Sequence, residues 1–195
     1  MGFLSNNCKI FPHTGEMLKQ SRTFSCGDGD LDDFFLHDAV KYEQQLLGKS
    51  YCYRLDSDNS IVVCFFTLSN SSVEVRTLPN NRKRKFTENI PYEKNLSSYP
   101  ATLIGRLGVD KEFGGKGIGT ELIKYIKQWV LLPGNITACR YLTVDAYNNE
   151  VTLKFYEANG FGTLFSSDKQ EKEHVGLPQE KELRTRLMYF DLMLI

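Results

Sequence analysis

The sequence predicts an α+β protein, because helix and strand patterns follow one another along most of its 195 residues. Three observations lead to this expectation: an amphipathic helix pattern near the amino terminus, two strand patterns joined by a polar turn, and a later strand–helix–strand–helix series. The hydrophobic share of 41% and the charged share of 25% are ordinary for a globular domain. A chain of this length can bury one core, so we expect a single domain over residues 1–195.

The amino-terminal half predicts one helix and one pair of strands. Residues 30–45 carry apolar side chains at helical spacing, and aspartates at the start of this segment suit the positive end of a helix dipole. We interpret these aspartates as capping and solvation. Residues 50–55 and 61–68 have strand patterns, and the polar residues 56–60 between them have the length of a hairpin turn.

The segment 69–99 has the least regular pattern in the chain and contains two prolines and the basic run Arg82–Lys85. Strand signals resume directly after it, so we expect an irregular insertion within the domain rather than a linker. Such a basic run is most often a solvated loop, although it could also contact RNA phosphates.

The carboxy-terminal half predicts a series of alternating strands and helices. The expected strands and helices are a strand at 100–109, a helix at 117–131, a strand at 140–147, a short helix at 149–159, and strands at 161–165 and 184–194. No internal repeat interrupts this series, which supports the expectation of one domain.

Charge, cysteine and histidine content exclude several classes of protein. The 24 basic and 24 acidic residues cancel, so no global field attracts nucleic acid or a membrane. Five cysteines are scattered without a CxxC pair, and three isolated histidines lack metal-ligand spacing, so we expect neither disulfides nor a metal site. We see no signal peptide and no apolar run long enough to cross a bilayer, and therefore expect a soluble, cytoplasmic protein.

The most informative segment is a glycine-rich turn between the strand at 100–109 and the helix at 117–131. Its glycines lack a Cβ atom, so backbone N–H groups can close on an anion, and the start of the helix adds further donors and a positive dipole end. Lys116 and Thr120 can supply additional contacts to phosphate oxygens. The pattern therefore predicts a site for a pyrophosphate.

Two common glycine loops do not fit this turn. A Walker A loop requires Ser or Thr after Gly-Lys, but Gly117 follows Lys116. A dinucleotide-binding loop that started at Gly115 and Gly117 would require a glycine where Thr120 stands.

A second motif lies in residues 145–161, where a strand is followed by Asn149, Thr152, Phe155 and Tyr156, and then by Gly160-Phe161. Together the glycine loop and this segment resemble the two signatures of the GNAT superfamily of N-acetyltransferases. Thr152 replaces the usual alanine, a mild departure. The resemblance is strong over residues 101–165, and over the whole chain it extends loosely to the subgroup that contains acetyltransferase toxins of bacterial toxin–antitoxin pairs.

The resemblance implies a three-layer fold with helices on both faces of a mixed, mostly antiparallel sheet, whose two central parallel strands splay apart. It also implies that acetyl-CoA binds between those strands, with its pantetheine amides paired to the β-strand and its pyrophosphate in the glycine loop. The implied cofactor-binding residues are Leu107, Gly108, Val109, Gly114, Gly115, Lys116, Gly117, Ile118, Gly119, Thr120 and Asn149. Family members usually carry Gln or Arg where this chain has Gly114, so we expect somewhat weaker cofactor binding.

The family match implies that Tyr156 is the catalytic general acid. A phenol with a pKa of ~10 is protonated at neutral pH and can protonate the departing thiolate. No carboxylate stands in the strand at 101–109 to act as a general base, so either water carries the proton or the acceptor amine arrives neutral. An α-amine, with a pKa of ~8 against ~10.4 for lysine, would do so more readily. Arg106 in this strand could serve structural pairing or substrate contact.

The acceptor stays open at this point. A small-molecule or protein amine is one candidate, and the α-amine of aminoacyl-tRNA is the alternative that the toxin subgroup suggests. A non-catalytic module that binds CoA is a third reading, which the intact loop and Tyr156 disfavour. The resemblance also admits a homodimer and an antitoxin protein as partners, and it implies no membrane partner.

Overall fold

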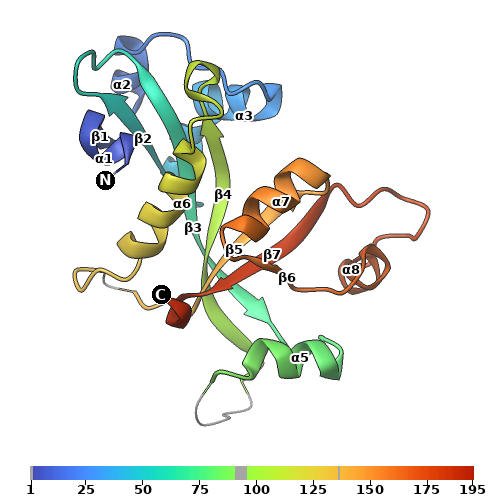
Figure 1. Cartoon of the computed structure of the whole chain (residues 1–195). Helices are drawn as coiled ribbons and strands as arrows, with labels where there is room; N and C mark the ends of the chain where they lie inside the picture. Colours follow the sequence, from blue (N-terminus) through green and yellow to red (C-terminus); the bar gives the residue numbers. More distant parts are fainter. Residues whose placement is uncertain (1, 91–95, 136) are drawn as a thin grey trace. The chain divides into compact units, whose positions relative to one another are not determined.

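The computed structural model of the chain describes residues 2–90, 96–135 and 137–195 (Figure 1). It divides into two compact units, of which the first comprises Met1–Asn70 and Ile104–Trp129 and the second Ser71–Leu103 and Val130–Ile195. No helix among the described residues has the length and apolar character that crossing a membrane requires.

Among the described residues, seven strands form one mixed sheet in the order β1-β2-β3-β4-β5-β7-β6. Their bounds are Cys8–Pro12 (β1), Lys49–Leu55 (β2), Val62–Glu74 (β3), Ser98–Val109 (β4), Tyr141–Tyr147 (β5), Gly162–Thr163 (β6) and Thr185–Asp191 (β7). β4 and β5 pair in parallel over Ala101–Leu103 and Tyr141–Thr143, whereas β1 with β2, β2 with β3, β5 with β7 and β6 with β7 pair antiparallel. The predicted α+β class with a mixed, mostly antiparallel sheet is confirmed.

The helices lie around this sheet. Their bounds are Phe3–Asn7 (α1), Gly15–Gln20 (α2), Gly29–Asp33 (α3), the π-helical turn Phe34–Asp38 (η1), Ala39–Gln44 (α4), Asn80–Thr87 (α5), the 3₁₀ turn Lys111–Phe113 (η2), Ile118–Trp129 (α6), Glu150–Ala158 (α7), Asp168–Val175 (α8) and the 3₁₀ turn Leu192–Leu194 (η3). The predicted helix at 30–45 is therefore continuous through α3, η1 and α4. The cap is Asp28, which accepts hydrogen bonds from the amides of Asp30 and Leu31. The capping role expected of the aspartates within 30–45 therefore belongs to the aspartate before them, and Asp32 instead accepts from the Ser25 hydroxyl and the Cys26 amide.

Helices cover both faces of the sheet within the first unit. On one face, Phe35 of η1 stacks on Phe65 of β3 with a ring-centroid distance of 4.7 Å. On the other face, Trp129 of α6 packs edge-on against Tyr51 of β2 at 4.7 Å and against Phe66 of β3 at 6.1 Å. Because neighbouring residues of a strand point to opposite faces, the Phe65-Phe66 pair separates the two layers. This arrangement is the expected three-layer packing.

The second unit has a core of its own. Its buried side chains are Val73, Val75, Leu78, Phe86, Tyr99, Ala101, Tyr141, Leu164 and Phe165. The ring of Phe86 from α5 lies 4.1 Å from that of Tyr141 on β5, and the Tyr141 hydroxyl donates a hydrogen bond of 2.9 Å to the Phe86 carbonyl. These contacts fix α5 to the sheet.

The expectation that residues 69–99 form an irregular insertion is wrong for much of that segment. β3 continues to Glu74, α5 occupies Asn80–Thr87, and β4 begins at Ser98. The pattern was hidden because α5 is polar around most of its circumference and buries only Phe86. Residues 91–95 lie outside the described residues.

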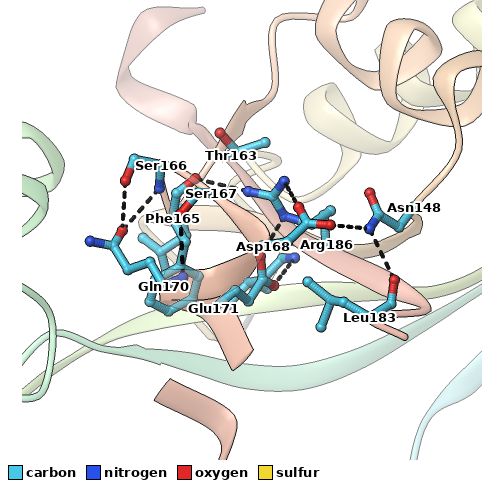
Figure 2. Close-up of polar contacts among 12 residues, drawn as sticks. Asn148, Thr163, Phe165, Ser166, Ser167, Asp168, Gln170, Glu171, Leu183 and Arg186 are labelled. Carbon is cyan, nitrogen blue, oxygen red and sulfur yellow. Dashed lines mark hydrogen bonds and ion pairs between the residues drawn. The ribbon is translucent and has the colours of Figure 1, made fainter. Parts of the chain in front are cut away.

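A cluster of charged side chains joins α8 to β7 in the second unit (Figure 2). Arg186 donates from Nε to Glu171 Oε2 and from Nη1 to Asp168 Oδ1, each at 2.6 Å. Its Nη2 donates to the carbonyl of Phe165 at 3.0 Å, and Glu171 Oε1 accepts from the Leu187 amide at 2.6 Å. Every group of this buried cluster therefore has a partner, as burial of charge requires.

Candidate functional site

The glycine loop begins where β4 ends, and Asp110 fixes that point in the first unit. The Asp110 amide donates to the Val63 carbonyl at 2.9 Å, and the Asp110 carboxylate accepts from the amides of Glu112 and Ser25 at 2.9 and 3.0 Å. Asp110 thus caps the turn η2 and ties the loop to the segment that precedes α3.

The loop itself requires glycine at two positions. Gly115 and Gly117 adopt φ angles of +69° and +76°, in the left-handed region that other residues rarely adopt. No atom lies within 4 Å of a Cβ built at either position, so conformation rather than space demands glycine here. Gly114 instead has φ −59°, which any residue can adopt, and its amide donates to the Lys111 carbonyl at 3.2 Å.

Helix α6 starts directly at this exposed loop. Its hydrogen-bond ladder begins with the Glu121 amide, which donates to the Gly117 carbonyl at 3.1 Å. Ile118 is buried at 1% exposure and, with Leu122 and Ile126, anchors α6 to the core. The loop residues 114–117 are exposed, and the start of a helix is a place where backbone amides can receive an anion.

The side chain of Lys116 is engaged within the loop. Its Nζ donates to the Glu112 carbonyl at 2.9 Å and lies 5.4 Å from the centre of the Phe113 ring. A phosphate contact, as the sequence predicts, requires this exposed side chain to leave the Glu112 carbonyl. Thr120 is exposed in the first turn of α6.

The three predicted cofactor-binding residues of β4 follow one another before the loop. Gly108 is buried against Phe35 and Cys26, and a Cβ at this position would lie 3.2–3.3 Å from their side chains. Leu107 and Val109 are half-buried and lie beyond the stretch Ala101–Leu103 that pairs with β5.

The second motif forms α7 in the second unit, and its residues set both ends of that helix. Asn149 caps the start, because its side-chain oxygen accepts from the Thr152 amide at 2.9 Å. Gly160 has φ +82°, and the Phe161 amide donates back to the Tyr156 carbonyl at 3.0 Å, which ends the helix. Asn149, predicted to bind cofactor, therefore has a structural role as a cap in this structure.

Tyr156 lies on the buried side of α7. It is 6% exposed, and its ring packs edge-on against Phe155 and Phe161 at centroid distances of 5.0 and 5.5 Å. Burial raises the pKa of the Tyr156 phenol well above the ordinary value of 10.0, so the hydroxyl stays protonated at neutral pH. The chemistry available to Tyr156 is therefore proton donation.

Arg106 is exposed on β4 in the first unit. Its Nη1 donates to the Gly105 carbonyl at 2.7 Å, and its guanidinium carbon lies 5.0 Å from the centre of the Phe34 ring. The Arg106 side chain is thus held by the Phe34 ring and a backbone carbonyl rather than by a carboxylate. Sequence reasoning could not find Phe34, because its contact with Arg106 joins residues far apart in the chain.

The part of the chain that the structure describes contains no group of three or more His, Cys, Asp and Glu side chains arranged to hold a metal ion. The five cysteines are free, and three of them are buried. The glycine loop and the end of β4 belong to the first unit, and α7 with Tyr156 belongs to the second.

Comparison with known proteins gives a consistent result. Residues 73–161, which include the glycine loop and α7, match the model of the Acetyltransferase (GNAT) family. A tRNA-acetylating toxin of Mycobacterium tuberculosis is 29% identical over 102 residues, which are 52% of this chain and 54% of that protein. The chain thus matches about half the length of this curated relative.

Solved structures resemble the chain over nearly its full length. A mutant of KacT matches with a TM-score of 0.71 at 20% identity over 97% of each chain. AtaT complexed with acetyl-methionyl-tRNAfMet matches with a TM-score of 0.68 at 22% identity over 96% of each chain. AtaTR bound with AcCoA matches with a TM-score of 0.65 at 19% identity, over 97% of this chain and 96% of that one. At such identities these likenesses concern the fold, and the match to the acetyltransferase (GNAT) family concerns residues 73–161 of this chain.

Proposed function

We propose that the chain is an acyltransferase that transfers the acetyl group of acetyl-CoA to a primary amine. The observation that carries this proposal is the loop between β4 and α6, in which two left-handed glycines lead directly into the start of an amphipathic helix. A pyrophosphate is the group that such a backbone cradle accepts best.

The residues present fit acetyl-CoA. Gly115 and Gly117 leave the loop open on its exposed side, and the amides of Ile118, Gly119 and Thr120 belong to the first turn of α6. We assign the diphosphate to Gly114–Thr120 and the pantetheine amides to the backbone of Leu107–Val109. Acetyl-CoA supplies a thioester, whose carbonyl carbon an amine can attack.

Tyr156 is the proposed general acid. As the amine nitrogen bonds to the acetyl carbon, the carbon–sulfur bond breaks and the sulfur receives the proton of the Tyr156 hydroxyl. The nitrogen loses one proton, which can return to the phenolate through water. The raised pKa of Tyr156 keeps the phenol protonated at neutral pH, so the hydroxyl carries a proton that it can donate.

The acceptor is an amine that arrives neutral or loses its proton to water. Residues 101–109 of β4 hold no carboxylate, so this strand contributes no general base. This favours an amine of modest basicity, such as an α-amine with a pKa of ~8. Small molecules and protein amino termini both present such groups.

Aminoacyl-tRNA is the second candidate acceptor, since it also carries an α-amine. Two comparisons support it: the M. tuberculosis relative is a tRNA-acetylating toxin, and AtaT has been solved with acetyl-methionyl-tRNAfMet. AtaT has also been solved bound to the C-terminus of the antitoxin AtaR. If aminoacyl-tRNA is the acceptor, we propose by analogy that the chain binds an antitoxin protein. We also propose that it acts in the cytoplasm and forms a homodimer.

An acceptor screen tests the proposal. Purified protein is incubated with acetyl-CoA and separately with polyamines, peptides with free amino termini, or aminoacyl-tRNA, and released thiol is measured. We expect thiol release that depends on one acceptor class. Acetyl-CoA should also raise the melting temperature, because a ligand that binds only the native state stabilises it. If NAD or ATP shifts the melt and neither acetyl-CoA nor CoA does, the proposal is wrong.

A further inference from the structure

Helix α5 carries four consecutive basic residues, which have different surroundings. One of them is hydrogen-bonded to the rest of the second unit, and the other three form no ion pair among the described residues. Arg82 points inward: its Nε donates to the Leu164 carbonyl at 2.7 Å and its Nη2 to the Thr163 carbonyl at 2.5 Å. Arg84 and Lys85 are exposed, and Lys83 is half-buried. Arg82 is therefore a structural residue of the second unit, whereas the next three cations face solvent.

The free cations lie on a helix that is held firmly. Phe86 is 3% exposed and packs on Tyr141, whose hydroxyl donates to the Phe86 carbonyl. Together with the two hydrogen bonds of Arg82, these contacts fix α5 at both its first and its last turn. Lys83, Arg84 and Lys85 are thus presented from a rigid support.

The cations of α5 repel one another along a short helix. α5 has no side-chain cap, Pro79 stands at its N-cap position, and no acidic residue lies in its first turn. Arg84 and Lys85 lie in the last turn, where the helix dipole favours positive charge, but neighbouring like charges repel one another.

Several cations elsewhere on the surface have acidic partners. Lys9 pairs with Asp56, Arg22 with Asp58, Lys41 with Asp38, Arg76 with Glu74 and Lys154 with Glu150. Within residues 2–90, 96–135 and 137–195, Lys83, Arg84 and Lys85 form no ion pair. Their charge is therefore available to an anionic partner.

A polar groove adjoins the start of α5 in the same unit. Its volume is about 310 Å³, and it is lined by Thr77, Pro79, Ser166, Ser167, Lys169, Gln170, Glu173 and His174. Hydroxyl, amide and ammonium groups dominate this lining, although Glu173 adds one negative charge. Residues 71–90 present no large exposed hydrophobic side chain, which an acidic peptide would use as an anchor. Cations beside hydroxyl and amide groups instead suit a sugar–phosphate backbone.

We propose that Lys83, Arg84 and Lys85, with the groove at the start of α5, form a docking surface for the phosphate backbone of an RNA. This proposal rests on the second candidate function. An amine acceptor that is attached to RNA needs a surface on the enzyme that binds the RNA, in addition to the site where the amine reacts. Arg82 takes no part in binding and serves to hold α5.

The test compares two variants with the same change in net charge. In the first, Lys83→Gln, Arg84→Gln and Lys85→Gln are combined. In the control, Lys9→Gln, Lys19→Gln and Lys41→Gln remove three exposed lysines from the first unit. Binding of labelled, uncharged tRNA is measured by anisotropy over a series of salt concentrations, with polyglutamate as a competing polyanion.

We expect the α5 variant to lower the slope of log affinity against log salt by about 2–3, since each lost phosphate contact removes ~0.7–0.9. At about 0.1 M salt this corresponds to a loss of affinity on the order of 10²-fold, whereas the control keeps the wild-type slope. Because surface substitutions of this kind change stability little, the α5 variant should melt close to wild type.

Equal slopes for the two variants, or a wild type whose tRNA binding does not depend on salt, would overturn the proposal. Polyglutamate that competes as well as RNA of equal charge would overturn the choice of RNA and indicate an acidic protein. Acetyl-CoA should stabilise all three proteins equally. If acetyl-CoA does not stabilise the wild-type protein, the result counts against the transferase function itself. A failure of the RNA proposal can therefore be distinguished from a failure of the proposed function.

Discussion

Arg186 on β7 donates a 2.6 Å hydrogen bond to Glu171 on α8, and both side chains are almost fully buried. The pair lies among partners that satisfy every remaining polar group of both residues (Figure 2). Such a pair stabilises little relative to an apolar replacement, but removing one member leaves a buried charge without compensation. This asymmetry gives the first prediction.

Glu171→Gln should lower the free energy of unfolding by about 3 kcal/mol, because the Arg186 guanidinium keeps its burial and loses its buried counter-charge. Urea unfolding measures the change. Glu173→Gln, an exposed glutamate on the same helix, should change it by less than about 0.5 kcal/mol. The double variant Glu171→Leu with Arg186→Met should regain most of the loss. Equal effects of the two glutamate substitutions would show that the pair is not a coupled unit.

The charged cluster around Arg186 also explains why the sequence does not predict helix α8. α8 buries only Glu171, so it has no apolar face from which a helix could be predicted. α1 and β1 were missed for a related reason: the amides of Leu4 and Ser5 are capped by Glu121, over a hundred residues away. In each case a long-range polar contact replaces the local pattern.

The two motifs were predictable because their causes are local. Gly115 and Gly117 need only their own φ angles, and α7 carries its cap Asn149 and its terminating Gly160 within one short segment. The direction of the Lys116 side chain and the stacking of Arg106 on Phe34 depend on neighbours that fold against them. Residue types could therefore be read from the sequence, and side-chain partners could not.

Gly117→Ala should destabilise the native state by about 1–2 kcal/mol, because alanine disfavours the left-handed backbone that φ +76° requires. Gly117→Glu should in addition abolish the rise in melting temperature that acetyl-CoA causes, since a carboxylate would repel the pyrophosphate. Gly134→Ala is the control, because Gly134 has open space and no left-handed φ. An acetyl-CoA shift that survives Gly117→Glu would remove the loop from the cofactor site.

His13 should make stability fall on acidification. The side chain is 2% exposed, and burial lowers its pKa from 6.5 to about 4, an effect that the Phe35 backbone offsets in part. The unfolded chain binds this proton below pH 6.5 and the folded chain only near pH 4. The contribution is therefore complete above pH 6.5 and is lost as pH falls toward 4, by about 3 kcal/mol in total.

Chemical denaturation from pH 7 to 4 measures this loss, and comparison with His13→Leu isolates the part due to His13. The leucine variant should show a shallower decline over that interval. His37→Gln removes an exposed histidine and should keep the wild-type decline. If the stability of wild type and of His13→Leu depends on pH in the same way, folding does not lower the pKa of His13.

Tyr156→Phe should lower turnover by ~10²–10⁴-fold, the usual contribution of a positioned general acid. The ring contacts with Phe155 and Phe161 remain, so the melting temperature and the KM for acetyl-CoA should change little. Tyr147→Phe, at an exposed tyrosine of β5, is the control. A joint loss of turnover and acetyl-CoA affinity would assign the hydroxyl to binding instead.

The pH profile of the wild type adds a second check on Tyr156. Because its pKa is raised above 10.0, the phenol stays protonated through the alkaline range in which enzymes are assayed. We therefore expect no decline in turnover from this group below about pH 10. An alkaline decline below that pH that disappears in Tyr156→Phe would contradict the assignment.

The central claim is that this chain moves acetyl from acetyl-CoA to an amine. It is tested most directly by following acetyl-CoA labelled in its acetyl group, with each acceptor class of the screen present in turn. We predict that the label appears on an amine nitrogen as an amide, in amounts equal to the thiol released, and that Tyr156→Phe slows its appearance without weakening acetyl-CoA binding. Thiol release with no label on any amine, or label lost only to acetate, would contradict the account.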